Sequence, residues 1–328
     1  MAGAVTSKSF SGHWAHLNGL RTITATHADL VRSLLTVGYP SRRAAIRVVG
    51  PWRERMLVAM ATGYLDSALN TTPYFRNLEQ SEKVGVSFLL GEAFTHWFAQ
   101  QHMQIQFLVH VAGLSSCNWV SPTNPLPPKA GALPPALKSR PDFIGIRPRQ
   151  RHVFESKGRI RAPSAASIGK ALGQVSTLHS INGRAPTTRC ASFFMLKSSG
   201  TEGLVVDPPS AQDGLGVVFD DYEALARAYA FFLDRPIDGF SDDVTAGYVG
   251  REIEEGVFFG IDKEILSVVS ERPSEARSRR RRVREILARL EERSEEFSGR
   301  RDTNVSPGID GTILVDRRSP PVRPRRRK

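Results

Sequence analysis

The chain has 328 residues, of which 40% are hydrophobic and 24% charged, and its formal net charge is +12. These values are ordinary for a folded globular protein, while the positive charge favours a polyanionic partner, with nucleic acid the first candidate. Two cysteines exclude a disulfide framework or a four-cysteine zinc site, and no apolar run reaches the roughly 18 residues that a membrane span needs.

The first 80 residues predict mostly helices. Thr26 and Asp29 can cap a helix whose apolar residues recur between positions 30 and 35. A break at 38–41 and a basic segment at 42–49 give a loose match to a helix-turn-helix, although an ordinary helical pair has the same spacing. A further helix is expected from Trp52 to Leu69. The first 30 residues lack the apolar core of a signal peptide, so we expect a cytoplasmic location.

The next segment predicts a helix and then a strand. Apolar residues from Val86 to Trp97 follow helical spacing, and Glu92 lies beside that apolar face. Alternation over residues 105–111 predicts a strand. The proline-rich segment 121–135 must be a loop, which can serve as a polyproline ligand, run near a substrate cleft, or be a plain surface insertion.

Two short apolar runs with charges set into them, residues 140–146 and 151–159, predict neighbouring strands. Glu155 and Lys157 would point to one face because strand side chains alternate. If Asp142 lies on the adjacent antiparallel strand, two carboxylates and an ammonium group meet. Mg²⁺ typically takes one or two protein carboxylates together with substrate phosphate oxygens, so the pattern favours metal-assisted phosphate chemistry.

A predicted helix over 168–178 and a buried strand over 190–196 follow, giving the order strand, strand, helix, strand. Pro141-Asp142, Glu155 and Lys157 in this order resemble the core motif of the PD-(D/E)XK, or restriction-endonuclease-like, nuclease superfamily. The resemblance implies an α/β fold with a mixed central sheet flanked by helices, and Mg²⁺- or Mn²⁺-dependent hydrolysis of phosphodiester bonds. The segment around Glu155 and the helix after it look more like bacterial genome-defence or repair members of the superfamily than like a digestive nuclease.

The resemblance also implies roles for single residues. Asp142 and Glu155 would ligate the metal, and Lys157 would position water or stabilise the transition state. A helix before the first core strand often adds an acidic ligand, a position that Glu92 occupies, although a solvated or capping glutamate fits the sequence equally. Gln174, on the helix after the lysine, would assist catalysis.

Basic residues surround the predicted site. They can bind phosphate groups, although charged strand ends and turns are also common on solvated hairpins. The candidates for nucleic-acid binding are Lys138, Arg140, Arg147, Arg149, Arg151, Arg159, Arg161 and Lys170.

Downstream, residues 203–207 and 216–219 predict two strands that complete the sheet, and residues 222–233 predict a helix. Asp207 either joins the metal site or starts a turn. Ser241 is expected to open a further helical stretch. From residue 272 the chain has 18 Lys and Arg against 9 Asp and Glu, with an amphipathic helix around 283–290 and an expected disordered end at 323–328.

We therefore expect a helical region at 1–83, a nuclease-like core at 84–220, a helical cover at 221–271 and a basic helix and tail at 272–328. The leading hypothesis is a metal-dependent DNA nuclease of the endonuclease kind, acting alone, as a homodimer or with a protein partner. The alternative is a scaffold subunit of a larger complex that binds nucleic acid on the same fold without cutting it. Patterns for a P-loop, a dinucleotide fingerprint, a Gly-x-Ser-x-Gly elbow and a His-Glu-x-x-His zinc site do not occur in the sequence.

Overall fold

The computed structural model describes residues 3–37, 51–120, 140–209, 214–233, 244–271, 273–299 and 302–318. Several sequence predictions lie outside these residues: the second helix of the loose helix-turn-helix match at 42–49, the proline-rich segment 121–135, Lys138, the helix start at 241–243 and the basic end at 323–328.

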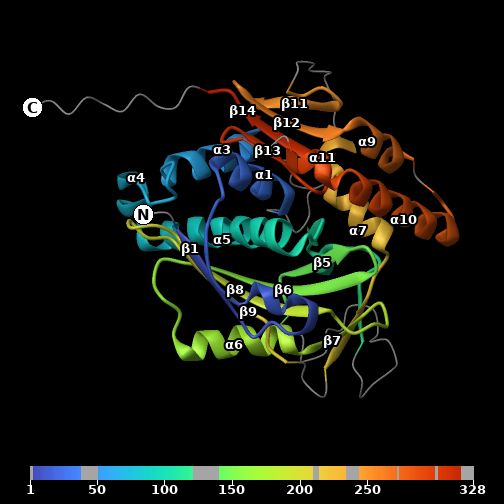
Figure 1. Cartoon of the computed structure of the whole chain (residues 1–328), viewed down its shortest axis with the longest axis horizontal. Helices are drawn as coiled ribbons and strands as arrows, with labels where there is room; N and C mark the ends of the chain where they lie inside the picture. Colours follow the sequence, from blue (N-terminus) through green and yellow to red (C-terminus); the bar gives the residue numbers. More distant parts are fainter. Residues whose placement is uncertain are drawn as a thin grey trace, which may run out of the picture.

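A seven-stranded mixed sheet forms the centre of the protein, in the order β2-β1-β9-β8-β6-β5-β3 (Figure 1). Strand β6 pairs with β5 in antiparallel and with β8 in parallel orientation. Every residue of β8 is buried, which confirms the buried strand predicted from its continuous apolar run. The strands are β1 (Ala4–Lys8), β2 (Gly19–Thr22), β3 (Phe107–Val109), β5 (Phe143–Arg147), β6 (Gln150–Arg159), β8 (Thr188–Met195) and β9 (Glu202–Val206).

Helices cover both faces of this sheet, so the α/β class is confirmed. Helix α5 (Gln80–Met103) lies on one face and α6 (Ala165–Ser176) on the other (Figure 1). On the α5 face, the Thr95 hydroxyl lies 3.0 Å from that of Ser156 on β6 and 2.6 Å from that of Ser192 on β8. Because three buried hydroxyls satisfy one another there, the helix has a fixed position on the strands.

Helix α1 (His27–Val37) packs between α5 and a second sheet, and its capping is as the sequence predicts. The Thr26 backbone N–H donates to the Asp29 carboxylate, and the Asp29 N–H donates to the Thr26 hydroxyl. Arg32 on α1 donates through Nε to the Ser306 hydroxyl at 2.9 Å, a buried bond that ties α1 to the second sheet. Helices α3 (Trp52–Tyr64) and α4 (Pro73–Arg76) complete this layer.

Two smaller sheets flank the central one. The first has the order β4-β10-β7 and the second β11-β12-β14-β13, the latter next to α9 and α10 (Figure 1). Their strands are β4 (Asn118–Val120), β7 (Leu178–Ile181), β10 (Leu215–Val218), β11 (Tyr248–Glu254), β12 (Val257–Asp262), β13 (Val305–Pro307) and β14 (Thr312–Asp316). The remaining helices are α7 (Asp221–Ala228), α8 (Ala230–Leu233), α9 (Lys263–Ser270), α10 (Ala276–Glu292) and α11 (Ser294–Gly299), with 3₁₀ turns η1 (Gly12–Leu17) and η2 (Val111–Gly113).

The structure corrects the secondary-structure predictions at both ends of the chain. The N-terminal region is not wholly helical, because β1 and β2 extend the central sheet and the helix from Trp52 ends at Tyr64 instead of Leu69. In β1, Val5 and Ser7 alternate as buried residues, a pattern too short to stand out in the sequence. After residue 241, the described residues form the β11–β12 hairpin before any helix, and β13 and β14 follow the basic helix α10, which the sequence did predict.

A close backbone approach joins α5 to β6 at Gly158. A Cβ atom built on Gly158 would lie 1.5 Å from the Ser87 carbonyl oxygen, and one on Gly91 would lie 2.4 Å from the Gly158 Cα. Backbone cannot move aside as a flexible side chain can. These two glycines therefore set the distance between the helix and the strand.

We expect Gly158→Ala to lower the free energy of unfolding by about 3 kcal/mol or more, because α5 must shift away from β6. Gly169→Ala on α6 is the matched control, since within the described structure nothing lies within 4 Å of its built Cβ. That change should stabilise the protein by about 0.5–1 kcal/mol. Urea unfolding measures both values, and equal stability of the two variants would contradict the packing described here.

Candidate functional site

The structure brings Asp142, Glu155 and Lys157 together, as the sequence predicts. Phe143 on β5 pairs with Phe154 on β6, so Asp142 at the head of β5 stands opposite Glu155. One Asp142 carboxylate oxygen accepts a hydrogen bond from the Ser156 backbone N–H at 2.8 Å. The Lys157 ammonium group forms an ion pair with Glu155 on the same face of β6. Strand β5, which follows Asp142, pairs in antiparallel orientation with β6 on one side and β3 on the other.

Beside these residues, the edge of β6 that pairs with β5 farther back along the strand has no strand partner in the described structure. Pairing with β5 ends at Phe154, and among the described residues no strand pairs with 155–159 on that side. On its other side β6 continues in register with β8 as far as Arg159. Carboxylates and a lysine at a strand edge of this kind can face a substrate while the opposite edge stays anchored in the sheet.

Glu92 reaches the same place from α5. The residue is 2% exposed, and its Oε1 lies 3.9 Å from Nε2 of His110, which follows β3. Its charge interacts with those of Asp142 and Lys157, and with that of Arg53 on the first turn of α3. Glu92 is therefore neither solvated nor a helix cap, so of the two interpretations of the sequence the structure favours a buried acidic group beside the strand carboxylates.

Burial raises the pKa of all three carboxyl groups. Glu92 has a pKa of about 8, raised by desolvation and by the neighbouring Asp142 and partly offset by Arg53 and Lys157. The pKa of Glu155 is raised to about 7, again by desolvation first and then by Asp142, against the effect of Lys157. Desolvation raises the pKa of Asp142, while Lys157 and the Ser156 N–H lower it. A cation bound beside these three carboxyl groups would stabilise their ionised forms and lower their pKa values.

The donor set is compatible with a hard divalent cation. Within the described part of the chain, the second carboxylate oxygen of Glu155, Oε2, is buried and has no hydrogen-bond partner. No group of three or more His, Cys, Asp or Glu side chains among these residues is arranged to hold a metal by itself. Mg²⁺ commonly takes only one or two carboxylates from the protein and completes its shell with water and phosphate oxygens. Asp142 and Glu155 supply two carboxylates, and the charge of Glu92 on α5 interacts with that of Asp142.

Gln174 on α6 contacts the segment that precedes Asp142. It is 9% exposed on α6, and its Nε2 donates to the Arg140 carbonyl oxygen at 3.4 Å. Arg140 comes two residues before Asp142, and its guanidinium lies 5.6 Å from the Trp119 ring. Gln174 therefore contacts the chain segment that leads into Asp142, and its assisting role in catalysis stays a prediction.

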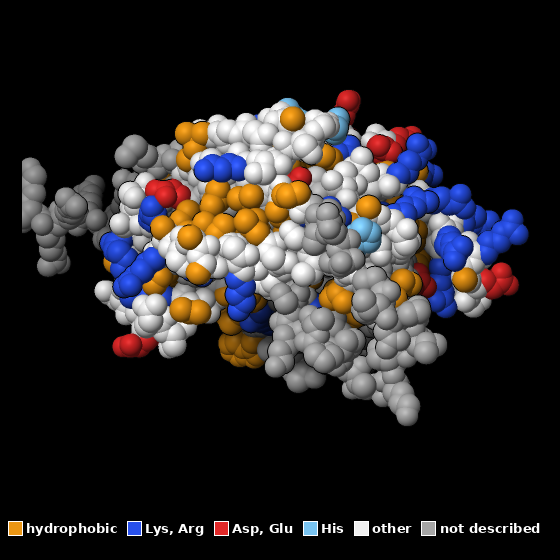
Figure 2. Space-filling model, turned by 90° about the horizontal axis from the view of Figure 1, so that it is seen from below, with side chains coloured by type: hydrophobic (Ala, Val, Ile, Leu, Met, Phe, Trp, Pro, Cys, Tyr) orange, Lys and Arg blue, Asp and Glu red, His pale blue; other side chains and the backbone are white. Residues whose placement is uncertain are grey.

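The predicted phosphate-binding residues separate into two groups. Arg159 lies on β6 two residues beyond Lys157 and donates to the Ser167 hydroxyl at 3.0 Å, and Arg161 and Lys170 are exposed nearby. Arg147, Arg149 and Arg151 lie at the β5–β6 turn, roughly 20 Å from Lys157 along the strand. On the face seen from below in Figure 2, Lys and Arg side chains gather mainly toward the two ends, and hydrophobic and uncharged groups occupy much of the centre.

The turn arginines have structural contacts. Arg151 forms an ion pair with Asp221, and Arg147 donates to the Met103 carbonyl oxygen at 3.2 Å while lying over the Trp14 ring. Arg149 has φ 62°, the left-handed conformation that a tight hairpin requires. Of the predicted basic residues, the structure therefore places Arg140, Arg159, Arg161 and Lys170 at the carboxylate end and these three at the opposite end.

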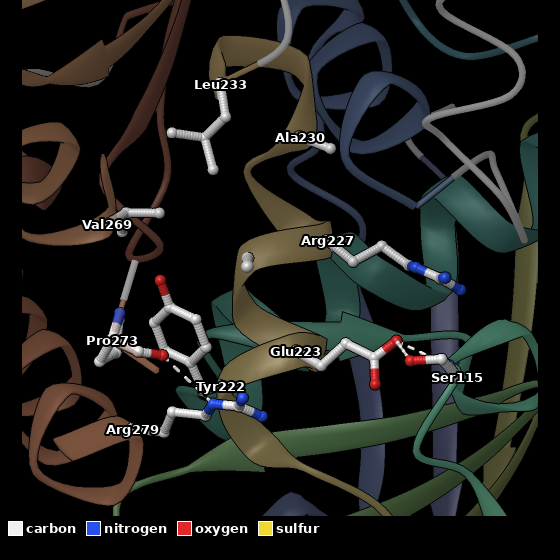
Figure 3. Close-up of a pocket in the computed structure, with 10 residues that line it drawn as sticks. Ser115, Tyr222, Glu223, Arg227, Ala230, Leu233, Val269, Pro273 and Arg279 are labelled. Atoms are coloured by element: carbon white, nitrogen blue, oxygen red, sulfur yellow. Dashed lines mark hydrogen bonds between the residues drawn. The ribbon is translucent and has the colours of Figure 1, made fainter. Parts of the chain in front are cut away.

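A pocket of about 510 Å³ lies elsewhere, between α7, α8, α9 and the loop after β3 (Figure 3). Its one acidic side chain, Glu223, points toward Ser115 and accepts hydrogen bonds from the Ser115 N–H and hydroxyl and from the Ser116 N–H. These bonds lower the pKa of Glu223 and occupy both oxygens, so it is poorly suited to act as a base. Asp207 likewise accepts from the Arg189 N–H at 2.7 Å and does not join the carboxylates at β6.

Comparisons with protein-family models, curated proteins and solved structures find no match to this chain. No helix in the described ranges has the length and apolar character needed to cross a membrane. The site is therefore interpreted from its own chemistry.

The sequence did not reveal two residues that lie beside Glu92 but outside the Asp142, Glu155 and Lys157 motif. His110 and Arg53 stand far from Asp142 in the chain and carry no pattern of their own, and only the fold places them beside Glu92. The Ser156 N–H that binds Asp142 is a backbone group, which no residue type reveals.

The raised carboxyl pKa values predict a pH-dependent stability of the metal-free chain. In the folded state Glu92 and Glu155 keep protons up to about pH 8 and 7, whereas unfolded glutamates lose theirs near pH 4.5. The stabilisation of the folded state by these two protonated glutamates is complete below about pH 4.5 and is lost as the pH rises through 7 to 8. In EDTA, the free energy of unfolding should fall by roughly 6 kcal/mol between about pH 5 and 9.

Glu92→Gln is the matched variant for this prediction, because it keeps the shape of the side chain and removes its titration. The decrease in stability should become clearly smaller in this variant, and added Mg²⁺ should restore much of it in the native chain. Chemical denaturation at a series of pH values measures this. If the stability of the native chain and that of Glu92→Gln changed equally with pH, the raised pKa of Glu92 would be contradicted.

Proposed function

We propose that this protein is a metal-dependent nuclease of the PD-(D/E)XK type that hydrolyses phosphodiester bonds of DNA, with Mg²⁺ or Mn²⁺ as cofactor. The observation that carries the proposal is the meeting of Asp142, Glu155 and Lys157 at the open edge of β6, with Glu92 behind them. Their spacing and their place at the strand edge support a restriction-endonuclease-like arrangement of the central sheet.

Each residue has a distinct part in this proposal. Asp142 and Glu155 would hold the cation, which when bound polarises a phosphate and lowers the pKa of a water molecule. The Lys157 side chain would lie beside the position where the phosphate develops negative charge, which it would stabilise. Glu92 adds acidic character from α5, and Gln174 holds the Arg140 segment so that Asp142 stays in place. Arg159, Arg161 and Lys170 would contact neighbouring phosphates.

The chemistry favours a polyanionic substrate over a small neutral one. The net charge of +12 and the basic residues around the carboxylates attract a nucleic-acid backbone. A genome-defence or repair role in bacteria rests on the resemblance alone. The scaffold alternative predicts tight, salt-sensitive binding of DNA that does not depend on metal.

The test is cleavage of supercoiled plasmid and linear duplex with Mg²⁺ or Mn²⁺ by the native chain, Glu155→Ala and Lys157→Ala, with EDTA as the control. Cutting that requires metal and is lost in both variants, with binding retained, supports the proposal. Absence of cutting on every substrate, with equal binding by all three chains, would instead support the scaffold subunit.

A further inference from the structure

Helix α10 has one buried apolar face and, over its first half, one exposed face made of arginines. The apolar face is buried where the helix packs on α7 and α9, and it consists of Val283, Ile286, Leu287 and Leu290. The exposed arginines stand at i, i+3, i+4 and i+7, so they lie on one side of the helix. We call this set the α10 arginine face: Arg277, Arg280, Arg281 and Arg284.

The α10 arginine face lacks the acidic partners that other arginines of the same helix have. Arg279 pairs with Asp220 at 2.9 Å, and Arg282 pairs with Glu285 at 3.0 Å. Among the residues that the structure describes, the four arginines of the face have no ion pair or side-chain hydrogen bond. The next acidic residue along α10 is Glu291, about 10 Å beyond the end of the face. The face is therefore a positive surface without compensating charge.

The stability of the helix does not account for these arginines. Two pairs of like charges repel each other at i and i+4, namely Arg277 with Arg281 and Arg280 with Arg284. The first turn of α10 has no acidic residue, and a positive side chain there opposes the helix macrodipole. An anion bound across the face would relieve both effects, because it places negative charge between the arginines.

The α10 arginine face lies toward the end of the central sheet that is remote from the carboxylates. Arg279 contacts Asp220 at the N-cap of α7, and the adjacent Asp221 pairs with Arg151 at the β5–β6 turn. Lys157 lies roughly 20 Å from Arg151 along β6. Helix α10 stands at the right-hand end in Figure 1, and Lys and Arg side chains gather at that end in Figure 2. A ligand that contacts both the face and the carboxylates must span on the order of 20 Å.

An arginine row of this kind is complementary to a phosphate backbone. A guanidinium group can bind one phosphate through two parallel N–H donors. The face covers about 10 Å of the helix axis, and a duplex carries roughly three phosphates per strand over that length. A membrane surface is the less favoured polyanion, because an interfacial helix inserts its apolar face and that of α10 is buried within the protein.

We propose that the α10 arginine face is a second, sequence-independent DNA-binding surface, which holds the backbone while the carboxylates act on another part of the same molecule. The choice of DNA as the nucleic acid rests on the nuclease function above. The face raises the affinity for long DNA and takes no part in the chemistry.

Binding in EDTA tests this without cleavage. A fluorescently labelled duplex of about 30 base pairs would be titrated with each chain at a series of salt concentrations. The triple glutamine variant combines Arg277→Gln, Arg281→Gln and Arg284→Gln, and the triple lysine variant changes the same three residues to Lys. The dispersed control removes three exposed charges from other helices by combining Arg55→Gln, Arg76→Gln and Lys263→Gln.

The triple glutamine variant should bind the duplex at least about 10-fold more weakly at low salt. The slope of log affinity against log salt concentration should become shallower by about 3, because each phosphate contact contributes roughly 0.9. The triple lysine variant keeps the charge and the dispersed control keeps the face, so both should stay within about 3-fold of native.

Equal affinity and equal salt slope of the native chain and the triple glutamine variant would overturn the proposal. So would an equal loss of affinity in the dispersed control, since net charge alone would then explain the binding. Loss of binding to phosphatidylserine vesicles in the triple glutamine variant, with DNA affinity unchanged, would show that the face binds a membrane instead.

The outcomes also separate this surface from the nuclease site. If the native chain cuts DNA but the triple glutamine variant binds as native does, the nuclease stands and the α10 arginine face fails. If no DNA is cut but the triple glutamine variant alone loses affinity, the α10 arginine face stands and the nuclease fails.

Discussion

Lys157→Met is expected to slow metal-dependent cleavage by about 10²- to 10⁴-fold while DNA affinity changes by less than about 5-fold. The lysine is the positive group nearest Glu155, with which it forms an ion pair, and its loss removes charge where the transition state gains negative charge. Methionine keeps much of the side-chain length and apolar stem. Single-turnover cleavage at saturating enzyme separates the chemical step from binding.

Lys263→Met is the matched control for Lys157→Met. Lys263 is an exposed lysine at the start of α9, outside the basic residues proposed to bind phosphates, so its replacement should change the cleavage rate by less than about 3-fold. Thermal unfolding of both variants excludes a folding defect, which matters because Lys157→Met leaves Glu155 without its ion-pair partner. Similar rates for the two variants, with both folded, would remove Lys157 from the proposed site.

Asp142→Asn should weaken Mn²⁺ or Mg²⁺ binding by at least about 100-fold, because it removes one of the two strand carboxylates from the site. The asparagine oxygen can still accept the Ser156 N–H bond, so the β5–β6 pairing should survive. Calorimetric titration with Mn²⁺ measures the affinity directly and requires no substrate.

Asp207→Asn is the control for this second prediction. Asp207 is also a carboxylate with a raised pKa at a strand end, but it binds the Arg189 N–H away from the site. Its replacement should leave metal affinity within about 3-fold of native. Equal metal affinities of the native chain and Asp142→Asn would mean that the cation, if bound, lies elsewhere.

The strands that carry the site could be predicted because their pattern is local. Alternation places Glu155 and Lys157 on one face, and the continuous apolar run of β8 gives its burial. What depends on contacts between distant segments could not be predicted. Residues 4–8 join the sheet through β9, nearly 200 residues later, and β14 pairs with β12 across the whole of α10.

The same distinction applies to the functional residues. Asp142 and Glu155 are recognised by type and spacing, whereas Arg147 and Arg151 match the same basic pattern as Arg159 but lie at the opposite end of β6. Sequence proximity could not separate them, because a strand of ten residues spans roughly 33 Å.

The most direct measurement of the central claim is the Mg²⁺ dependence of DNA cleavage by the native chain and by Glu155→Gln, which keeps the side-chain shape. The native chain should cut end-labelled DNA with a rate that saturates in Mg²⁺ and vanishes in EDTA, and Glu155→Gln should be slower by about 10³-fold or more. Equal cleavage by both chains, or cleavage that persists in EDTA, would contradict a metal-dependent site at Asp142 and Glu155.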